Sequence, residues 1–289
     1  MHAEARWAAA RDPEPQRRAM LCAMSGSRQA LFQAVLDRPA EDAPRALFAA
    51  FCDAQGDPYG AFIRAQLART QALRTGTDED AWRFYHEAGR IQTEHRTVAW
   101  TNGVEKFVES CRFIRGFVEE VVVDARRYLD HADEIFRHAP IRHLVLSEVG
   151  DLVTEIARDP HLEQLASLSL DNTYRKHPIG DAGLAAIAAS PHLRNLRLLD
   201  VSDQGIGTAG LEALGASKTL PSLVYVNLTG NRFEDPREGY GTDWASSRII
   251  HIDSTLPPLG RELEAKYGDL PWLHGPSRLR NYPPDKAEL

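Results

Sequence analysis

The sequence lacks the features that mark membrane, secreted and nucleic-acid-binding proteins. None of its apolar runs approaches the roughly 18 residues of a membrane-spanning helix, and its first 27 residues hold no continuous apolar segment of the kind found in secretion signals. Its 34 lysines and arginines are outnumbered by 41 acids, a formal net charge of −7. That balance argues against nucleic acid and anionic membrane surfaces as partners.

Cysteine is also scarce. The chain has three, Cys22, Cys52 and Cys111, and none forms a C-x-x-C pair. An odd number of widely spaced cysteines suits neither a disulfide framework nor a zinc site. We therefore expect reduced, structural thiols in a cytoplasmic protein.

What the sequence does contain is a recurring phrase: an apolar residue, two variable residues, an apolar residue, one variable residue and a third apolar residue. Its last complete copy ends in Asn231 and fits the pattern L-x-x-L-x-L-x-x-N. Such a phrase, repeated every 20–29 residues or so, is typical of leucine-rich repeats, in which each copy adds one strand to a stacked solenoid. The copies are Val118-Val121-Val123, Ile141-Leu144-Leu146, Leu165-Leu168-Leu170, Leu196-Leu199-Val201 and Leu223-Val226-Leu228, with a degenerate sixth at Ile250 and Ile252.

The segments between these copies resemble the helices of ribonuclease-inhibitor-like leucine-rich repeat proteins. Residues 179–187 and 206–214 share their order of glycines and apolar residues, and a Pro-x-Leu sequence follows each. The resemblance implies a horseshoe with parallel strands on its concave side and helices on its convex side. A terminal helix before Tyr267, together with Trp272, is expected to cover the last repeat, because the ends of a solenoid need protection.

The N-terminal part has apolar residues at helical spacing, as in Leu31, Phe32 and Val35. Residues 28–66 resemble the short repeat-companion domain found beside leucine-rich repeats in some bacteria. We expect Trp82 and Trp100, on the helices of this part, to be packing residues. The resemblance implies an architecture and no chemistry; it rests on Asp42-Ala43-Pro44-Arg45, Gly56-Asp57-Pro58 and Phe62-Ile63-Arg64-x-Gln66.

The predicted fold is thus an α/β solenoid, a leucine-rich repeat horseshoe preceded by a small all-α N-terminal segment. Its expected parts are a mobile arm (residues 1–27), a helical repeat-companion-like domain (28–115), the leucine-rich repeats (116–255) and a C-terminal cap and tail (256–289).

One glycine motif resembles a cofactor site. Gly205, Gly207 and Gly210 spell G-x-G-x-x-G between a strand and a helix, as in dinucleotide-binding folds. However, the acid expected about 20 residues further on is missing, and the preceding repeat has a similar loop. We therefore expect no cofactor.

Two clusters of titratable residues also have simple explanations. His131, His138 and His143 lie near Asp133 in the sequence, but their spacing matches no zinc site. The acid pair at residues 119–120 suits a solvated face as well as it suits acid–base catalysis. We therefore expect neither a metal site nor a catalytic residue.

The concave face follows from the repeat phrase, because successive side chains of a strand point to opposite faces. If the apolar residues point into the core, three outward positions per strand give eighteen in all, of which five are acidic and none is lysine or arginine. The candidate binding residues are Glu120, Asp124, His143, Asp171, Leu198, Asp200, Tyr225, Asn227, His251 and Asp253.

An acidic concave face favours a basic protein partner. The sequence therefore predicts a non-catalytic protein-binding module, plausible as a regulator or inhibitor that sequesters its partner. One alternative is a structural spacer in a larger assembly. Another is an enzyme with a site at the junction of the helices and the solenoid, suggested by Arg64, His86, Arg90 and His95.

Overall fold

The computed structural model describes residues 27–95, 97–172, 176–232, 240–243, 248–251, 258–274 and 286; for the short stretches 240–243 and 248–251 it describes the backbone. The strands are β1 (Ser110–Ile114), β2 (Phe117–Asp124), β3 (His143–Ser147), β4 (Ser167–Asp171), β5 (Leu198–Asp200), β6 (Tyr225–Asn227), β7 (Tyr240–Asp243) and β8 (Arg248–His251). The α-helices are α2 (Arg28–Asp37), α3 (Ala43–Ala54), α4 (Tyr59–Thr75), α5 (Asp78–Glu94), α6 (Ala125–His138), α7 (Val153–Ile156), α8 (Gly180–Ala188), α9 (Thr208–Gly215) and α10 (Pro258–Tyr267). The short 3₁₀ turns are η1 (Thr97–Trp100), η2 (Val104–Lys106), η3 (Gly150–Leu152), η4 (Pro160–Gln164) and η5 (Pro271–His274).

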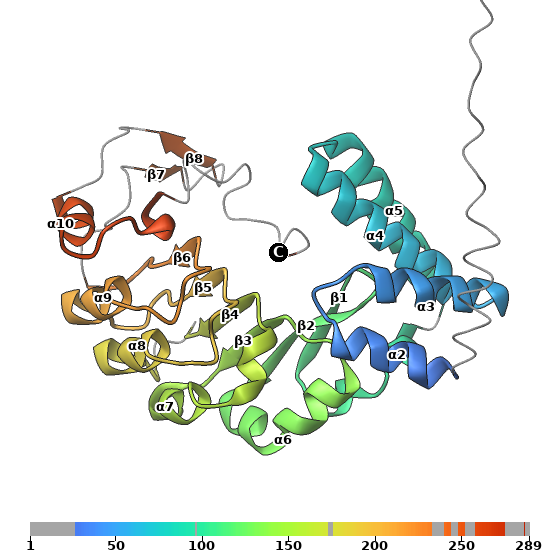
Figure 1. Ribbon diagram of the computed structural model, residues 1–289, viewed down its shortest axis with the longest axis horizontal. Helices are drawn as coiled ribbons and strands as arrows, with labels where there is room; N and C mark the ends of the chain where they lie inside the picture. The colour runs from blue at the N-terminus through green and yellow to red at the C-terminus, as the bar shows by residue number, and fades with distance from the viewer. Residues whose placement is uncertain are drawn as a thin grey trace, which may run out of the picture.

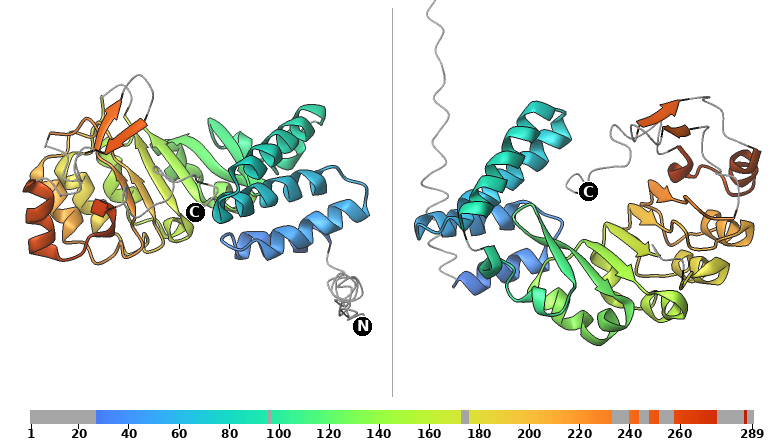
Figure 2. Two further views of the ribbon diagram at one scale, coloured as in Figure 1. Left: turned by 90° about the horizontal axis from the view of Figure 1, so that it is seen from above. Right: turned by 180° about the vertical axis from the view of Figure 1, so that it is seen from behind.

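A six-stranded, mostly parallel sheet forms the centre of this α/β fold. Its strands lie in chain order from β1 to β6; β1 is antiparallel to β2, and the pairs from β2 to β6 are parallel. Figure 1 shows the sheet on the inner side of an arc, with α6, α7, α8 and α9 along the outer side, and the view from behind in Figure 2 agrees. We call the inner side of the sheet the concave face and the helical side the convex side.

The register confirms the predicted alternation of side chains. One apolar position of each phrase lines up across β2 to β6, and every side chain in that row is completely buried. A second buried row runs through Val123, Leu146 and Leu170. The first row consists of Val121, Leu144, Leu168, Leu199 and Val226.

Side-chain amides link the loops that follow neighbouring strands. Asn231 accepts hydrogen bonds from the backbone amides of Gln204 and Ile206 and donates to the carbonyls of Val201 and Leu228, at 2.8–3.1 Å. Gln204 lies at the same place one copy earlier; it accepts from Ile179 N and donates to Leu170 O at 2.6 Å. These bonds satisfy backbone groups that would otherwise be buried without partners. The pattern identified Asn231 alone, although its spacing also applies to Gln204.

The helices α2 to α5 form the N-terminal part of the molecule, as the apolar spacing predicted. Their core is aromatic: the rings of Tyr59 and Trp100 stack with centroids 4.7 Å apart, and Phe48 and Phe62 pack beside them. Phe117, the first residue of β2, belongs to the same cluster. The N-terminal helices therefore share a core with the sheet.

Two of the sequences that resemble a repeat-companion domain contact the hairpin between β1 and β2. Gln66 Oε1 accepts a hydrogen bond from Gly116 N at 2.7 Å, and a Cβ on Gly116 would lie 2.8 Å from the Ile63 backbone. Arg115 donates to Asp42 Oδ1 at 2.9 Å. Gly116 has a φ of +91°, which favours glycine. These residues thus have a structural role in docking helices on the sheet.

The structure corrects the predicted helical range of residues 28–115. Ser110–Ile114 is strand β1, which pairs with β2, so the boundary at residue 115 would cut a hairpin. The repeat phrase does not reveal β1 because β1 is antiparallel and its alternate residues are only partly covered.

The predicted sixth copy is also wrong as a continuation of the sheet. Arg248–His251 forms β8, which pairs antiparallel with β7 in a separate two-stranded sheet. The parallel order ends at β6 within the described residues.

The residues of η5 cover the end of the sheet. Trp272 and Leu273 are buried in the main core, and η5 contacts β6, which agrees with the predicted covering role of Trp272.

Two further expectations about burial were wrong. Trp82 is 63% exposed, whereas Trp100 is buried as predicted. Glu119 was expected to suit a solvated face but is completely buried, because Arg45 and Arg115 neutralise it.

In the part of the chain that the structure describes, no helix combines the length and the apolar character needed to span a bilayer.

Candidate functional site

The concave face presents the outward residues of β2 to β6 in rows, as predicted. The sheet register places Glu120, His143, Ser167, Leu198 and Tyr225 side by side in the first row. The second row consists of Val122, Val145, Ser169, Asp200 and Asn227. The third contains Asp124, Ser147 and Asp171, at the carboxyl ends of their strands. Strand alternation thus brings eight of the ten candidate residues onto the same face of the sheet.

Leu198 and Tyr225 form a small apolar patch on this face. Both lie at the start of their strands, and Tyr225 packs against the buried pair Leu198 and Ala166. The Tyr225 side chain is half-buried, so part of it lies at the surface of this face. An aromatic side chain in this position resembles the anchors that contribute most energy to protein interfaces.

Asp200 is held in place by three hydrogen bonds. Its Oδ1 accepts from Ser202 N at 3.0 Å and from Ser202 Oγ at 2.7 Å, and its Oδ2 accepts from Asn227 Nδ2 at 3.0 Å. Asp171, on the neighbouring strand, is exposed. The two carboxylates place negative charge at the carboxyl ends of adjacent strands.

Asp124 has a structural role. Its Oδ1 accepts hydrogen bonds from the backbone amides of Arg126 and Arg127, at 2.9 and 3.1 Å, and so caps the N-terminus of α6. An aspartate in this position stabilises a helix. The sequence pattern alone could not separate this role from binding.

His143 lies in the predicted row but is completely buried, so it offers no surface to a partner in this structure. Its Nδ1 lies 2.8 Å from Ser167 Oγ, and its Nε2 is buried without a hydrogen-bond partner. Burial lowers the pKa of His143 well below its ordinary value, and the neighbouring Arg142 charge lowers it further. His143 is therefore neutral near pH 7.

Glu120 is occupied by two cations of the same chain. Arg112 Nη2 lies 2.8 Å from Glu120 Oε2, and Lys286 Nζ lies 2.6 Å from the same oxygen. Sequence spacing could not reveal these contacts, since Lys286 is 166 residues away from Glu120.

Two of the ten candidate residues have no described side chain. Asp253 lies outside the described residues, and of His251 only the backbone is described.

The glycine motif after β5 already holds an anion from the protein itself. Asp181 Oδ1 accepts a hydrogen bond from Gly207 N at 2.5 Å, beside the start of α9. A Cβ on Gly210 would lie 2.7 Å from the same Asp181 oxygen and 2.9 Å from Ile206. The glycines thus let α9 pack closely on the preceding repeat, and Asp181 occupies the place of a phosphate.

The histidine cluster of the sequence does not come together. His131 pairs with Glu134, His138 Nδ1 contacts Asn102 O at 2.8 Å, and Asp133 lies 3.2 Å from His161.

Within the described residues, one group with metal-ligand chemistry does lie together: Glu264, Asp269 and His274, whose ligand atoms lie within 4.8 Å of one another. Two of its members, His274 and Glu264, already form an ion pair with each other at 2.8 Å.

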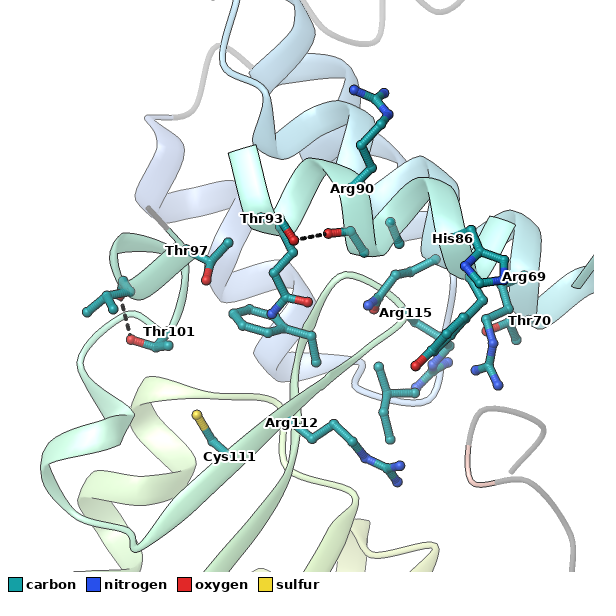
Figure 3. Close-up of a pocket in the computed structure, with 18 residues that line it drawn as sticks. Arg69, Thr70, His86, Arg90, Thr93, Thr97, Thr101, Cys111, Arg112 and Arg115 are labelled. Atoms are coloured by element: carbon teal, nitrogen blue, oxygen red, sulfur yellow. Dashed lines mark hydrogen bonds between the residues drawn. The ribbon is translucent and has the colours of Figure 1, made fainter. Parts of the chain in front are cut away.

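A cavity of about 710 Å³ lies between α4, α5 and β1 (Figure 3). Two of the residues considered for an enzyme, His86 and Arg90, line it. Arg64 instead pairs with Asp53 on the protein surface, and His95 does not line the cavity. Among the described residues, the lining includes no aspartate or glutamate. The lining of the cavity therefore offers His86 no acid as a catalytic partner.

The two described cysteines fit structural roles. Cys52 is completely buried, and burial raises the pKa of its thiol to about 11. Cys111 is half-buried, and burial raises the pKa of its thiol as well. Thiols that remain protonated at neutral pH are poor nucleophiles.

Comparison with known families gives one match. Residues 192–215, which include β5 and α9, match a family model described as Leucine Rich repeat. Neither the curated proteins nor the solved structures that were compared with the chain gave a match. The family match, together with the strand order, supports a leucine-rich repeat protein, a class that generally serves as a protein-interaction module rather than as a catalyst.

Proposed function

We propose that this chain is a non-catalytic module, a leucine-rich repeat solenoid of the ribonuclease-inhibitor-like subtype, that binds a basic protein on its concave face. The order of β2 to β6, with a helix on the convex side after each of β2 to β5, supports this architecture. The helices α2 to α5 would then correspond to the repeat-companion domain. Stacked repeats present a broad curved surface, which suits a protein partner better than a small substrate.

The observation that carries the proposal is the pair of carboxylates at the ends of β4 and β5. Asp171 is exposed, and Asp200 is fixed by its hydrogen bonds to Ser202 and Asn227. Neither the described outward positions of β2 to β6 nor the polar residues that follow them, Ser202 and Thr229, include a lysine or arginine. Preorganised negative charge on a hollow face favours approach of a basic surface.

Contacts within the chain support this chemistry. The Lys286 ammonium group lies 2.6 Å from Glu120 on the concave face, and its side chain is only 22% exposed. The face thus accommodates a lysine side chain. The Leu198–Tyr225 patch adds the apolar anchor that a uniformly polar spacer would lack.

The partner would be held by shape and charge, and occlusion of its surface would make this protein a regulator or inhibitor. The free thiols of Cys52 and Cys111 support the cytoplasmic location that the cysteine pattern predicts. An enzyme at the junction is less favoured, because His86 and Arg90 meet no acid in the lining of the cavity.

The test is affinity capture from the native cell with two variants that lose the same number of charges. The concave variant carries Asp171→Asn, Asp200→Asn and Tyr225→Ala; the convex control carries Asp133→Asn and Glu155→Gln, both exposed on α6 and α7. We expect a basic protein to be retained by the control and lost by the concave variant. It should also be lost from the natural protein at high salt, because charge contacts are screened.

Equal retention by both variants would rule out the concave face. The single variant Asp171→Asn, which changes an exposed side chain, should weaken binding in the same direction. Circular dichroism of both variants would verify that each keeps its fold.

A further inference from the structure

One face of α5 carries an aromatic patch that the fold leaves uncovered. Residues three or four apart on a helix share a face, and every residue of this face is exposed. The large apolar side chains that stand exposed in the described part of the chain are Trp82, Tyr85 and Val98. Trp82 and Tyr85 belong to this face, and Val98 follows α5 in η1. The α5 face consists of Asp78, Trp82, Tyr85, His86, Gly89 and Thr93.

The rings of the α5 face hold one another in place. Trp82 and Tyr85 meet edge to face with ring centroids 5.8 Å apart, and His86 stacks on Trp82 at the same distance. Trp82 is nevertheless 63% exposed, and the exposure of so large an apolar surface to water is unfavourable. A side chain that is already ordered loses less conformational entropy when it binds. Trp82 therefore has the properties of an anchor at a protein interface.

Gly89 leaves a gap on the same face. Glycine in a helix can allow another segment to approach closely. At Gly183 and Gly210 that segment belongs to this chain, because an added Cβ would lie 2.5 and 2.7 Å from its neighbours. An added Cβ on Gly89 would meet no described atom within 4 Å. Gly89 is thus open to a group from outside the chain.

The cavity between α4, α5 and β1 lies beside Gly89 and suits an aromatic side chain (Figure 3). Its volume is about 710 Å³, and its walls include Val98 and Phe113. Its described lining also includes four arginines and no acid. An arginine that pairs with an acid in the chain, as Arg90 does with Glu94, keeps a flat guanidinium face on which a ring can stack. Tryptophan is the best partner for such a cation.

A protruding residue and a gap on one helix face make that face complementary to a second copy of itself. Trp82 and Gly89 are seven residues, about two turns, apart, and the midpoint between them falls between Tyr85 and His86. If two α5 helices pair antiparallel about a two-fold axis at this midpoint, Trp82 of each copy meets Gly89 of the other. Two-fold symmetry makes both contacts at once.

The charges along α5 fit the same arrangement. The first turn of α5 carries Asp78, Glu79 and Asp80. Antiparallel pairing brings this acidic turn to Gln92 and Thr93 of the other copy, which line the cavity with its arginines. Parallel pairing would instead bring the two acidic turns together. Opposite charges at the two ends of the contact therefore favour the antiparallel arrangement.

From these observations we propose that the α5 face forms the interface of a homodimer, in which Trp82 of each copy enters the cavity of the other copy beside Gly89. The indole ring contacts Val98 and Phe113 there and stacks on the guanidinium groups of the lining. Each cavity is thus completed by a residue of the second copy. This proposal is independent of the concave-face proposal, since it concerns a different surface and a different partner.

The test is sedimentation of the full-length protein over a range of concentrations, together with its amide chemical shifts. We expect the mass to rise from that of one chain to that of two, while shifts move on α5, η1 and β1. A mass that stays at one chain through millimolar concentrations would overturn the proposal. A dimer that moves no shift on α5 or around the cavity would overturn it as well.

The variant Trp82→Ala tests the protruding residue. It should raise the dissociation constant of the dimer at least about thirtyfold, as truncation of an interface anchor does. Phe84→Ala is the control, because Phe84 is an aromatic residue of α5 that lies outside the α5 face. The control should leave the dissociation constant unchanged, and an equal effect of both variants would contradict the role of Trp82.

The variant Gly89→Leu tests the gap. The position is open and leucine favours a helix more than glycine does, so the variant should fold at least as well as the natural protein. It should prevent the dimer because leucine fills the space that Trp82 requires. Glu87→Leu adds the same side chain at an exposed position of α5 outside the α5 face and should dimerise normally.

Circular dichroism at low concentration, where single chains predominate, would verify the fold of each variant separately from its association. A Gly89→Leu protein that still dimerises, or an equal loss of the dimer in Glu87→Leu, would overturn the proposal.

Discussion

Arg45 Nη2 donates a hydrogen bond to Glu119 Oε1 over 2.7 Å, and both side chains are completely buried. Arg45 belongs to α3 and Glu119 to β2, so this ion pair joins the N-terminal helices to the sheet. Arg115 binds both oxygens of the same carboxylate, at 3.0 and 2.8 Å. One buried carboxylate therefore binds two guanidinium groups at the junction, and Asp42, which pairs with Arg115, supplies the second negative charge.

Substitution of Glu119 should destabilise the whole molecule. Glu119→Gln leaves Arg45 and Arg115 buried without their shared counter-ion, and removal of one partner from a buried ion pair costs about 3–5 kcal/mol. Urea denaturation measures this loss in the free energy of unfolding. The control Glu109→Gln changes an exposed residue and should stay within about 0.5 kcal/mol. A similar small change in both variants would show that the junction does not depend on the network.

The two tryptophans of the N-terminal part should differ sharply in their effect on stability. Trp100 is 8% exposed and stacks on Tyr59, so Trp100→Ala should lower the free energy of unfolding by about 3–5 kcal/mol. Trp82 stands on the surface of α5, and Trp82→Ala should cost less than about 1 kcal/mol. Thermal unfolding of both variants measures these changes, and an equal loss of unfolding free energy in the two would contradict the described packing.

Acid should weaken the fold through His143. The pKa of His143 in the folded protein lies well below its ordinary value of 6.5, because burial disfavours the charged ring. Below about pH 6.5 the unfolded chain takes up a proton that the folded chain resists, so the free energy of unfolding falls by up to about 1.4 kcal/mol per pH unit from this group. This contribution is fully present above about pH 6.5 and is lost on acidification, until the pH reaches the folded pKa.

The measurement is urea denaturation at about pH 7.5 and about pH 5.5. His143→Gln should show a smaller loss between the two than the natural protein does. His177→Gln, which changes an exposed histidine, is the control for the loss of a histidine side chain. If His143→Gln retains the full dependence, other groups are responsible for it.

The repeat phrase predicted the central part of the fold well because a strand alternates strictly. Once Leu168, Leu199 and Val226 are assigned to the core, the orientation of every neighbouring residue on those strands follows. The same alternation places Asp200 and Asn227 among the outward residues, and the register sets them side by side. It could not show that Asp124 caps a helix or that His143 is buried, since those roles depend on what covers each residue.

The sequence pattern predicted neither the ion pairs that join the N-terminal helices to the sheet nor the cavity between α4, α5 and β1. Glu119 resembled a surface acid because its partner Arg45 is 74 residues away. Arg69, His86 and Arg112 line one cavity only because α4, α5 and β1 fold against one another. Distant contacts of this kind leave no periodic signal.

The sequence by itself determined the order of the parallel strands, their buried and outward rows and the helical character of the N-terminal part, because each depends on local spacing. Only the tertiary structure decided which charges are buried, which acids are engaged by the chain's own cations and where a cavity opens. Those properties depend on packing between segments distant in the chain, and the free energy of a charge depends on what surrounds it.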